Sequence, residues 1–391
     1  MRRILIFSLV YYPRNIGGAE VAIKEITDRI SPQEIEFDMI TLRKQAPAFE
    51  RVGNVNVYRV GLPWFGQRTN SSKIFLLSKI FFVPLAFLKA IFLNHRDKYD
   101  VVWSIMASYA GFATFLFKKV KPEIPFILTI QEGDNFGRRQ GIFRPFFRMI
   151  FAAADRIQAI SKFLSEWSKL MGAKCPIVIV PNGVDFDHFS RLIDGETRQQ
   201  MREEDHLQDF DTSVITTSRL VEKNAVDDLI RSLALLERSC KLIILGTGQE
   251  EQKLKNLTKA LGVEDRVFFK GFVPHSEMPK YLQSADIFVR PSLSEGLGNS
   301  FLEAMAAGLP VIATPVGGIP DFLKDGETGL FCEVRNPKSI AQKVEKLIKD
   351  RESREHIVKQ AREMVRNNYQ WGMVAGKMKD VLCYSRENSH N

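Results

Sequence analysis

DIFVRPSLSEGLGNSFLEAMAAGLPVIAT, residues 286–314, contains a complete strand–loop–helix–strand unit. The apolar run 286–292 predicts a strand, and SEGLGN predicts a loop. SFLEAMAA predicts a helix that ends at Gly308, and PVIAT predicts the next strand. A helix that connects two strands in this way is typical of a parallel sheet, so this stretch indicates an α/β fold.

The same alternation of strand and helix runs through the chain. Apolar runs that end in turn residues lie at 2–10, 37–42, 55–60, 100–106, 125–131, 156–161 and 176–183, and again at 213–220, 241–248, 266–271, 286–292, 309–314 and 329–333. Helices are expected at 226–237, 250–261 and 276–283. A polar stretch at about 190–211 separates the two series. We therefore predict two Rossmann-like, doubly wound parallel-sheet domains that face each other across a cleft, with ligands bound beyond the carboxyl ends of the strands.

Composition limits the class of protein. The chain has 391 residues, of which 45% are hydrophobic and 26% are charged, so two cores of ordinary size are expected. Its four cysteines form no CxxC pair, which favours a reduced, cytosolic protein without a zinc site or disulfide framework. The first residues, MRRILIF, fit a buried strand better than a signal peptide because the apolar run is short and has no cleavage site.

The positive charge is concentrated in the first half. Residues 1–187 contain 26 Lys and Arg against 16 Asp and Glu, whereas residues 188–391 contain 29 against 30. The first half also holds 20 of the 29 phenylalanines. No nucleic-acid-binding motif accompanies this charge, so an anionic membrane surface is the expected partner rather than nucleic acid.

Two apolar stretches of the first half bear on this expectation. Residues 73–93 would just span a bilayer, but lysines and a proline interrupt them, so an interfacial or buried helix is favoured. Residues 137–155 interleave arginines with phenylalanines. Peripheral contact with the membrane is expected, with apolar contacts from the rings of Phe81, Phe82, Phe143, Phe146 or Phe147.

Two further motifs are given structural interpretations. Gly246 and Gly248 follow a strand, but Glu251 stands where a dinucleotide-binding turn has its third glycine, so a tight turn is preferred. Asp185 and Asp187 resemble a metal-binding DxD pair, but no further oxygen ligands lie nearby in the sequence. A capped turn is therefore favoured.

The loop and helix of the opening stretch suit a phosphorylated ligand. A helix that begins near Asn299 directs unpaired N–H groups outward, and glycines such as Gly298 let an anion approach. Glu303, in the expected first turn, could accept the hydroxyls of a ribose, while Glu295 would meet the group at the other end of a diphosphate. Alternatively, Glu303 only interacts with the helix dipole, which would leave Glu295 and the glycines without a role.

Two other segments carry features that suit phosphate. Arg219 and Lys223 follow a strand and could bind a leaving diphosphate, although a solvated basic turn is the alternative. Gly17 and Gly18 lie at the start of an expected helix near the N-terminus. Without side chains, their backbone could contact the same phosphates directly.

These motifs together resemble the retaining glycosyltransferases of family 4, which have the GT-B fold. The resemblance rests on SEGLGNSFLEAMAAGLPVIATPVGGIPD, SRLVEKN, PNGVD and GGAE, in the expected order over nearly the whole chain. It implies a UDP-sugar or GDP-sugar donor, no metal, Glu303 on the ribose, and Glu295 near the anomeric carbon. It also implies diphosphate contacts from Arg219 and Lys223. Further sugar or phosphate contacts are implied for Asn299, Ser300 and Phe301, partly through backbone N–H groups.

The resemblance also has departures. Many members have an arginine and a lysine five residues apart, where this chain has four, and many have a histidine where this chain has Gln131. Glutamine cannot act as a base near neutral pH, but retaining chemistry of this kind is thought to use the departing phosphate instead. Glu132 and Asp134 remain candidate acceptor contacts.

The predicted organisation follows from the same resemblance. Its last helix crosses back to the first domain, which gives an acceptor-binding domain of residues 1–187 plus 372–391 and a nucleotide-sugar-binding domain of residues 188–371. The predicted activity is transfer of a sugar to a lipid-linked acceptor in cell-surface glycan or glycolipid synthesis, at the inner face of the cell membrane. The alternatives are a nucleotide-sugar epimerase, a sugar phosphorylase, or a binding protein without turnover.

Overall fold

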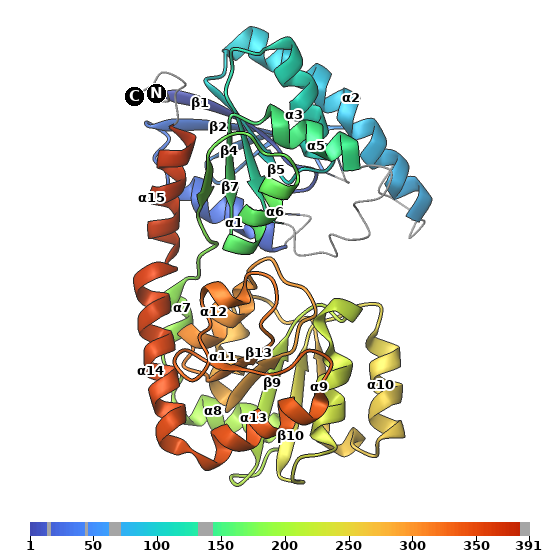
Figure 1. The fold of residues 1–391 in the computed structure, drawn as a ribbon, viewed down its shortest axis with the longest axis vertical. Coiled ribbons are helices and arrows are strands. Elements are labelled where there is room, and N and C mark those ends of the chain that lie inside the picture. Colours follow the sequence, from blue (N-terminus) through green and yellow to red (C-terminus); the bar gives the residue numbers. More distant parts are fainter. Residues whose placement is uncertain (14–16, 44–45, 62–71, 132–143, 384–391) are drawn as a thin grey trace. The chain divides into compact units, whose positions relative to one another are not determined.

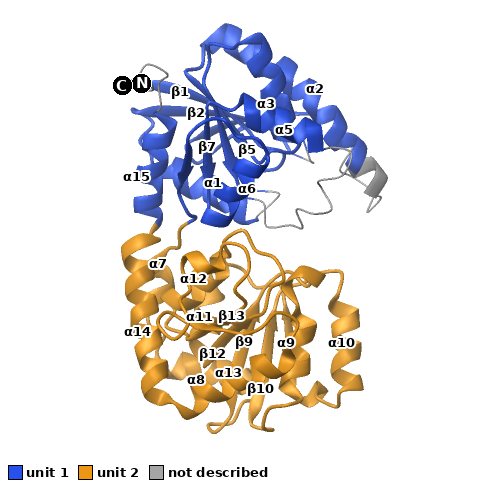
Figure 2. Ribbon diagram, viewed as in Figure 1, with its two compact units in different colours: residues 1–182, 371–391 blue, residues 183–370 orange. Residues whose placement is uncertain are grey.

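The structure is a computed structural model that describes residues 1–13, 17–43, 46–61, 72–131 and 144–383. It divides into two compact units, residues 1–182 with 371–391 (unit 1) and residues 183–370 (unit 2) (Figure 2). The division after 182 lies five residues before the predicted one. Helix α7 (Phe186–Ser190) explains this difference, because it packs on unit 2 helices and buries Phe189 fully.

Unit 1 is built on an eight-stranded sheet in the order β3-β4-β2-β1-β5-β6-β7-β8 (Figure 1). The strands are β1 (Arg2–Phe7), β2 (Ile35–Leu42), β3 (Phe49–Val52), β4 (Val55–Val60), β5 (Val101–Ile105), β6 (Phe126–Ile130), β7 (Arg156–Ala159) and β8 (Ile177–Ile179). All pairings are parallel except β3–β4, a hairpin at the sheet edge. The prediction missed β3 because FERV is short and half polar.

Helices cover both faces of this sheet. They are α1 (Gly18–Asp28), α2 (Ser72–Asp97), α3 (Tyr109–Val120), α5 (Arg144–Ala153), α6 (Lys162–Leu170) and α15 (Trp371–Leu382). Alternate residues of β1 point to opposite faces. Ile4 and Ile6 join the core under α1 and α15, whereas the ring of Phe7 lies 6.2 Å from that of Phe117 in α3. Helix α15 belongs to unit 1, although it follows unit 2 in the chain.

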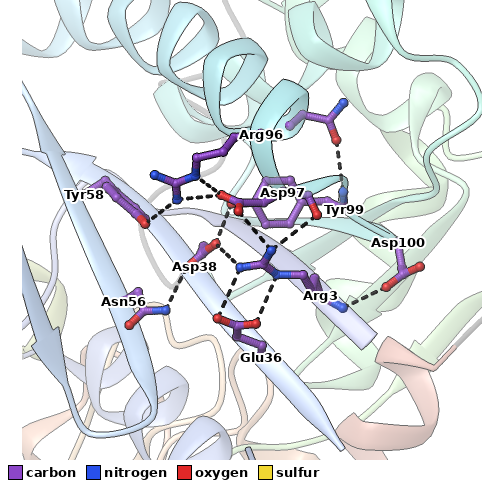
Figure 3. Close-up of polar contacts among 10 residues, drawn as sticks. Arg3, Glu36, Asp38, Asn56, Tyr58, Arg96, Asp97, Tyr99 and Asp100 are labelled. Carbon is purple, nitrogen blue, oxygen red and sulfur yellow. Dashed lines mark hydrogen bonds and ion pairs between the residues drawn. The ribbon is translucent and has the colours of Figure 1, made fainter. Parts of the chain in front are cut away.

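A polar network joins the end of α2 to the start of the sheet (Figure 3). Arg3 Nε lies 3.1 Å from Glu36, and Arg3 Nη1 lies 3.0 Å from Asp97. Asp38 is 1% exposed and accepts a hydrogen bond from Tyr99 Oη at 2.5 Å. Each buried charge therefore has an opposite charge or a donor beside it, as burial requires.

Unit 2 has a six-stranded, entirely parallel sheet in the order β11-β10-β9-β12-β13-β14. Its strands are β9 (Thr212–Thr217), β10 (Cys240–Leu245), β11 (Val267–Gly271), β12 (Ile287–Arg290), β13 (Val311–Ala313) and β14 (Leu330–Phe331). Its longer helices are α8 (Gly195–Glu204), α9 (Val226–Leu233), α10 (Glu251–Ala260), α11 (Met278–Ser284), α12 (Asn299–Ala306), α13 (Pro337–Lys349) and α14 (Arg351–Asn368). This confirms the predicted pair of Rossmann-like sheets, although α9 ends four residues earlier than expected.

The two motifs given structural interpretations have structural roles. Gly246 has φ +132°, and a Cβ there would lie 1.8 Å from the carbonyl oxygen of Ser218, so the turn after β10 requires glycine. Asp185 accepts a hydrogen bond from the backbone N–H of His188 at 3.1 Å and caps α7. The tight turn and the capped turn are thus confirmed.

All four cysteines are free thiols. Cys240 and Cys332 are buried in the unit 2 core. Burial raises the pKa of the Cys332 thiol to about 12 and that of Cys240 to about 11. They therefore act as small apolar side chains.

Candidate active site

The candidate site in unit 2 lies where β9 and β12 end. These strands are parallel neighbours in the middle of the sheet, so the loops that follow them leave from the same edge. A backbone hydrogen bond from Leu293 N to Lys223 O, 2.7 Å long, joins the two loops directly. The structure thus brings together the two motifs that the sequence analysis singled out separately.

Gly298 forms the start of α12. Its φ of +93° is a left-handed conformation, and a Cβ there would lie 2.5 Å from the ring of Phe301. The chain can therefore turn into the helix at this point only with glycine. Asn299 and Ser300 are the first two helical residues, as predicted, so their N–H groups lie in the first turn of the helix.

Two predictions about this helix need correction. Glu303 is the fifth residue of α12 and lies in the second turn, not the first. Phe301 was expected to contact sugar or phosphate, but its ring is fully buried against Phe288 and Phe322, and its N–H donates to Gly298 O at 3.1 Å. Phe301 is therefore a core residue that anchors the helix.

Glu295 lies in a buried ion pair that the sequence analysis missed. It is 8% exposed, and its Oε2 lies 2.6 Å from Nη2 of Arg290, the last residue of β12. Its other oxygen accepts the Gly296 N–H at 3.1 Å. The only signal in the sequence was an arginine at the end of the otherwise apolar run DIFVRPS.

Arg219 and Lys223 lie in the loop after β9, and Lys223 is the middle residue of a short turn. Glu222–Asn224 form a single turn of 3₁₀ helix, and Ala225 follows it with φ +48°. Arg219 is exposed and Lys223 is half-buried. The residue five positions after Arg219 is Asn224, which is buried and donates to Arg219 O at 2.6 Å.

A histidine contacts Glu303, the residue that was predicted to bind the ribose. His275 follows β11, and its Nε2 lies 3.3 Å from Glu303 Oε1. The side chain of His275 is 55% exposed and that of Glu303 is 16% exposed. The sequence carried no pattern that would have selected His275.

Several buried polar atoms at this edge have no hydrogen-bond partner within the described parts of the chain. They are Thr216 Oγ1, Thr217 Oγ1 and Ser218 Oγ at the end of β9, and Arg290 Nε and Ser292 Oγ at the end of β12. Buried polar atoms are normally paired, so unpaired ones gathered at one strand edge indicate a place for a polar ligand. Over the described ranges, no three His, Cys, Asp or Glu side chains are grouped as a metal would require.

The remaining predicted site residues belong to unit 1. Gly17 N donates to Glu20 Oε2 at 2.9 Å, so a carboxylate of this chain already lies at the start of α1, and Gly18 is the first helical residue. Gln131 follows β6 and accepts a hydrogen bond from Asn182 at 3.4 Å. Glu132 and Asp134 lie outside the described residues.

Comparison with known proteins agrees with this fold. Over 98% of its length the chain is 29% identical to an uncharacterized glycosyltransferase of Methanocaldococcus jannaschii, 99% of which it covers. Over 61% of its length it is 32% identical to the GDP-mannose-dependent alpha-(1-6)-phosphatidylinositol monomannoside mannosyltransferase of Mycobacterium tuberculosis, and it covers 64% of that protein. The crystal structure of Anabaena HepE in complex with UDP and glucose has the same fold, with a TM-score of 0.78, 18% identity, and coverage of 98% of this chain and 99% of that one.

The two halves of the chain match two sequence families. Residues 16–188 match the family described as Glycosyltransferase Family 4, and residues 197–364 match the one described as Glycosyl transferases group 1. The fold is GT-B, and the chain belongs to the family 4 glycosyltransferases.

Proposed function

We propose that the chain is a retaining glycosyltransferase that moves a sugar from a UDP-sugar or GDP-sugar to a lipid-linked acceptor, without a metal. The observation that carries this proposal is the set of unpaired, buried polar atoms at the ends of β9 and β12, next to the N-terminus of α12. A diphosphate at that helix terminus would interact favourably with the positive end of the helix dipole.

Five of the candidate residues receive a role in this proposal. Glu303, one turn along α12, accepts the ribose hydroxyls. Arg219 and Lys223 neutralise the diphosphate, whose charge grows as the bond to the sugar breaks. Glu295, held in its buried pair, faces the sugar, and Gln131 of unit 1 contributes on the acceptor or sugar side. The departing phosphate takes the proton of the incoming hydroxyl.

The lipid-linked acceptor has two kinds of support. The mycobacterial relative is named for a phosphatidylinositol-linked acceptor. In this chain, one helix face of unit 1 is suited to a membrane. We define the outer helical surface as Leu76, Leu77, Ile80, Phe81, Leu85, Leu88 and Phe92 of α2, Leu116 and Val120 of α3, and Phe146 and Met149 of α5. All are apolar side chains that are more than a third exposed.

The charges on these helices favour an anionic bilayer over another apolar surface. The sequences of α2, α3 and α5 contain a single acidic residue, Asp97, and eight Lys or Arg residues. Arg144 and Arg148 are exposed beside Phe146. Basic side chains beside exposed apolar ones are the usual composition of a peripheral membrane contact, because the two attractions add.

Helix α2 is long and apolar enough to cross a membrane by length and composition. Its inner face, however, is part of the unit 1 core, since Phe82, Ala86, Ala90 and Leu93 are fully buried. We therefore propose peripheral attachment at the inner face of the cell membrane. The expectation that Phe82 contacts lipid is wrong, because α2 turns this ring into the core, while Phe143 lies outside the described residues.

The test is a screen of UDP-, GDP- and ADP-sugars for thermal stabilisation and hydrolysis, with excess EDTA. One uridine or guanosine donor should stabilise the protein and be hydrolysed slowly. Loss of hydrolysis in EDTA that manganese restores would contradict metal independence. Binding without any turnover, with or without a glycolipid acceptor, would favour the binding-protein alternative. Turnover that yields an epimer or requires free phosphate would favour the epimerase or phosphorylase.

A further inference from the structure

Arg290 is an unusual residue for its place in the fold. It ends β12, which lies between β9 and β13 in the interior of the sheet, and it is only 9% exposed. A buried guanidinium is costly unless its donors and its charge are matched by fixed partners. The rest of β12 is apolar, so this arginine calls for a specific explanation.

Its partners come from the loop after β9, the loop after β12 and the start of α12. Nη1 donates to Ser300 Oγ at 2.7 Å, at the start of α12. Nη2 donates to Glu295 Oε2 at 2.6 Å and to Asn224 Oδ1 at 3.1 Å. The guanidinium carbon also lies 5.3 Å from the ring centre of Phe301, which adds a cation–π attraction.

Two of these partners extend the linkage further. Asn224 donates to Arg219 O at 2.6 Å, so the loop after β9 is fixed through its amide. Glu295 is held on its second oxygen by Gly296 N. One guanidinium therefore connects the backbone beside Arg219, the carboxylate of Glu295 and the first turn of α12.

We propose that Arg290 is the positioning residue of the donor site, which sets the orientation of Glu295 and the spacing between the two loops. This inference rests on the proposed function, in which Glu295 faces the transferred sugar. The flat, forked geometry of arginine is needed for three partners in different directions, and a lysine ammonium on a flexible stem cannot reproduce it.

The test compares Arg290→Lys with Arg266→Lys in steady-state kinetics with the donor found by the screen. Arg266 is a matched control because it is 6% exposed in the same unit and donates to the carbonyls of Leu233, Leu236 and Glu237, before β11 begins. Misplacement of a catalytic group by about 1 Å can cost on the order of 100-fold in rate, so Arg290→Lys should lower kcat at least about tenfold with little change in donor KM. Arg266→Lys should lower the melting temperature without changing kcat.

A double-mutant cycle identifies the residue through which Arg290 acts. If Arg290 acts through Glu295, adding Arg290→Lys to Glu295→Gln should lower kcat no further. If the double variant instead loses kcat by the product of the two single losses, the proposal is overturned. A wild-type kcat in Arg290→Lys would overturn it as well. If Arg290→Lys does not fold, Asn224→Leu serves instead. It removes the hydrogen bonds from Asn224 to Arg219 O and from Arg290 Nη2 to Asn224, and leaves the pair of Arg290 with Glu295. It should still lower kcat, and an unchanged kcat would overturn the proposal.

Amide hydrogen exchange provides a readout that does not depend on turnover. In Arg290→Lys, residues 218–225 and 291–298 should both exchange faster, whereas Arg266→Lys should leave both segments as in the wild type. Unchanged exchange in both loops would overturn the positioning role. If the wild type turns over no donor, the proposed function fails, while the exchange comparison still decides whether Arg290 holds the loops.

Discussion

His275 Nε2 lies 3.3 Å from Glu303 Oε1, so the loop after β11 reaches the second turn of α12. The histidine is more than half exposed, whereas most of the glutamate side chain is buried. A pair whose histidine is open to water contributes at most about 1 kcal/mol to stability, because water screens it. Glu303 therefore keeps most of its capacity to accept other hydrogen bonds.

Because Glu303 is mostly buried and His275 is mostly exposed, we expect their substitutions to have unequal effects on donor binding. Glu303→Ala should weaken binding of the nucleoside diphosphate by about 1–3 kcal/mol, the usual cost of leaving buried hydrogen-bonding groups unsatisfied. His275→Ala should change the affinity by less than about fivefold. Isothermal calorimetry measures both, with Glu355→Ala on the exposed face of α14 as a control. An unchanged affinity in Glu303→Ala would remove the ribose role.

Lys223 should act mainly on the chemical step. Charge on the leaving diphosphate grows in the transition state, so Lys223→Ala should lower kcat by a larger factor than it raises donor KM. The control is Lys253→Ala, which removes an exposed lysine of α10 that pairs with Glu250. This substitution should change neither kcat nor donor KM. A pure KM effect would make Lys223 a ground-state contact.

Vesicle sedimentation tests the outer helical surface. The wild type should pellet with vesicles that contain acidic phospholipid, and high salt should release a substantial part, because the Debye length falls to about 3 Å at 1 M. Phe81→Ser with Leu88→Ser should weaken binding in high salt, and Arg144→Glu with Arg148→Glu should weaken it in low salt. Neither pair should change hydrolysis of a water-soluble donor.

The control for this experiment is Phe210→Ser, which removes a 76% exposed ring from unit 2. It should bind vesicles as the wild type does. Equal binding to neutral and anionic vesicles, or none to either, would contradict membrane attachment and indicate a soluble acceptor. Binding to another protein by the same surface would leave the vesicle pellet empty.

The network at the start of β1 predicts an acid-sensitive step in stability. Hydrogen bonds from Arg96 and then Arg3 lower the pKa of Asp97 in the folded state. Ionised Asp97 thus stabilises the fold above its usual pKa of about 3.9, and this contribution is lost as the pH falls through the lower folded value. The urea midpoint of the wild type should fall more steeply below about pH 4 than that of Asp97→Asn. Parallel curves would show that Asp97 is not linked to stability.

The sheets and the site edge could be predicted because their signals are local. Alternating apolar runs identified thirteen of the strands, and the glycine–asparagine turn identified the start of α12 within the loop SEGLGN. Local patterns decide where a chain extends and where it turns. The hairpin strand β3 was missed because FERV becomes a strand only through its pairing with β4.

The contacts that complete the site could not be predicted. Arg290 meets Asn224 across 66 residues of sequence, and His275 meets Glu303 across 28. Such pairs depend on which strands become neighbours, and no spacing rule in the sequence encodes them. Phe301 was misassigned for the same reason, since its burial depends on Phe288 and Phe322 in other elements.

The central claim is that the edge formed by β9, β12 and α12 supports metal-independent sugar transfer with retention. The most direct measurement is proton NMR of the anomeric signals while the purified chain consumes its UDP-sugar or GDP-sugar in excess EDTA. The account predicts that the first product formed has the anomeric configuration of the donor, and that Glu303→Ala slows its appearance. A product of opposite configuration, or no consumption of any nucleotide sugar by the folded wild type, would contradict it.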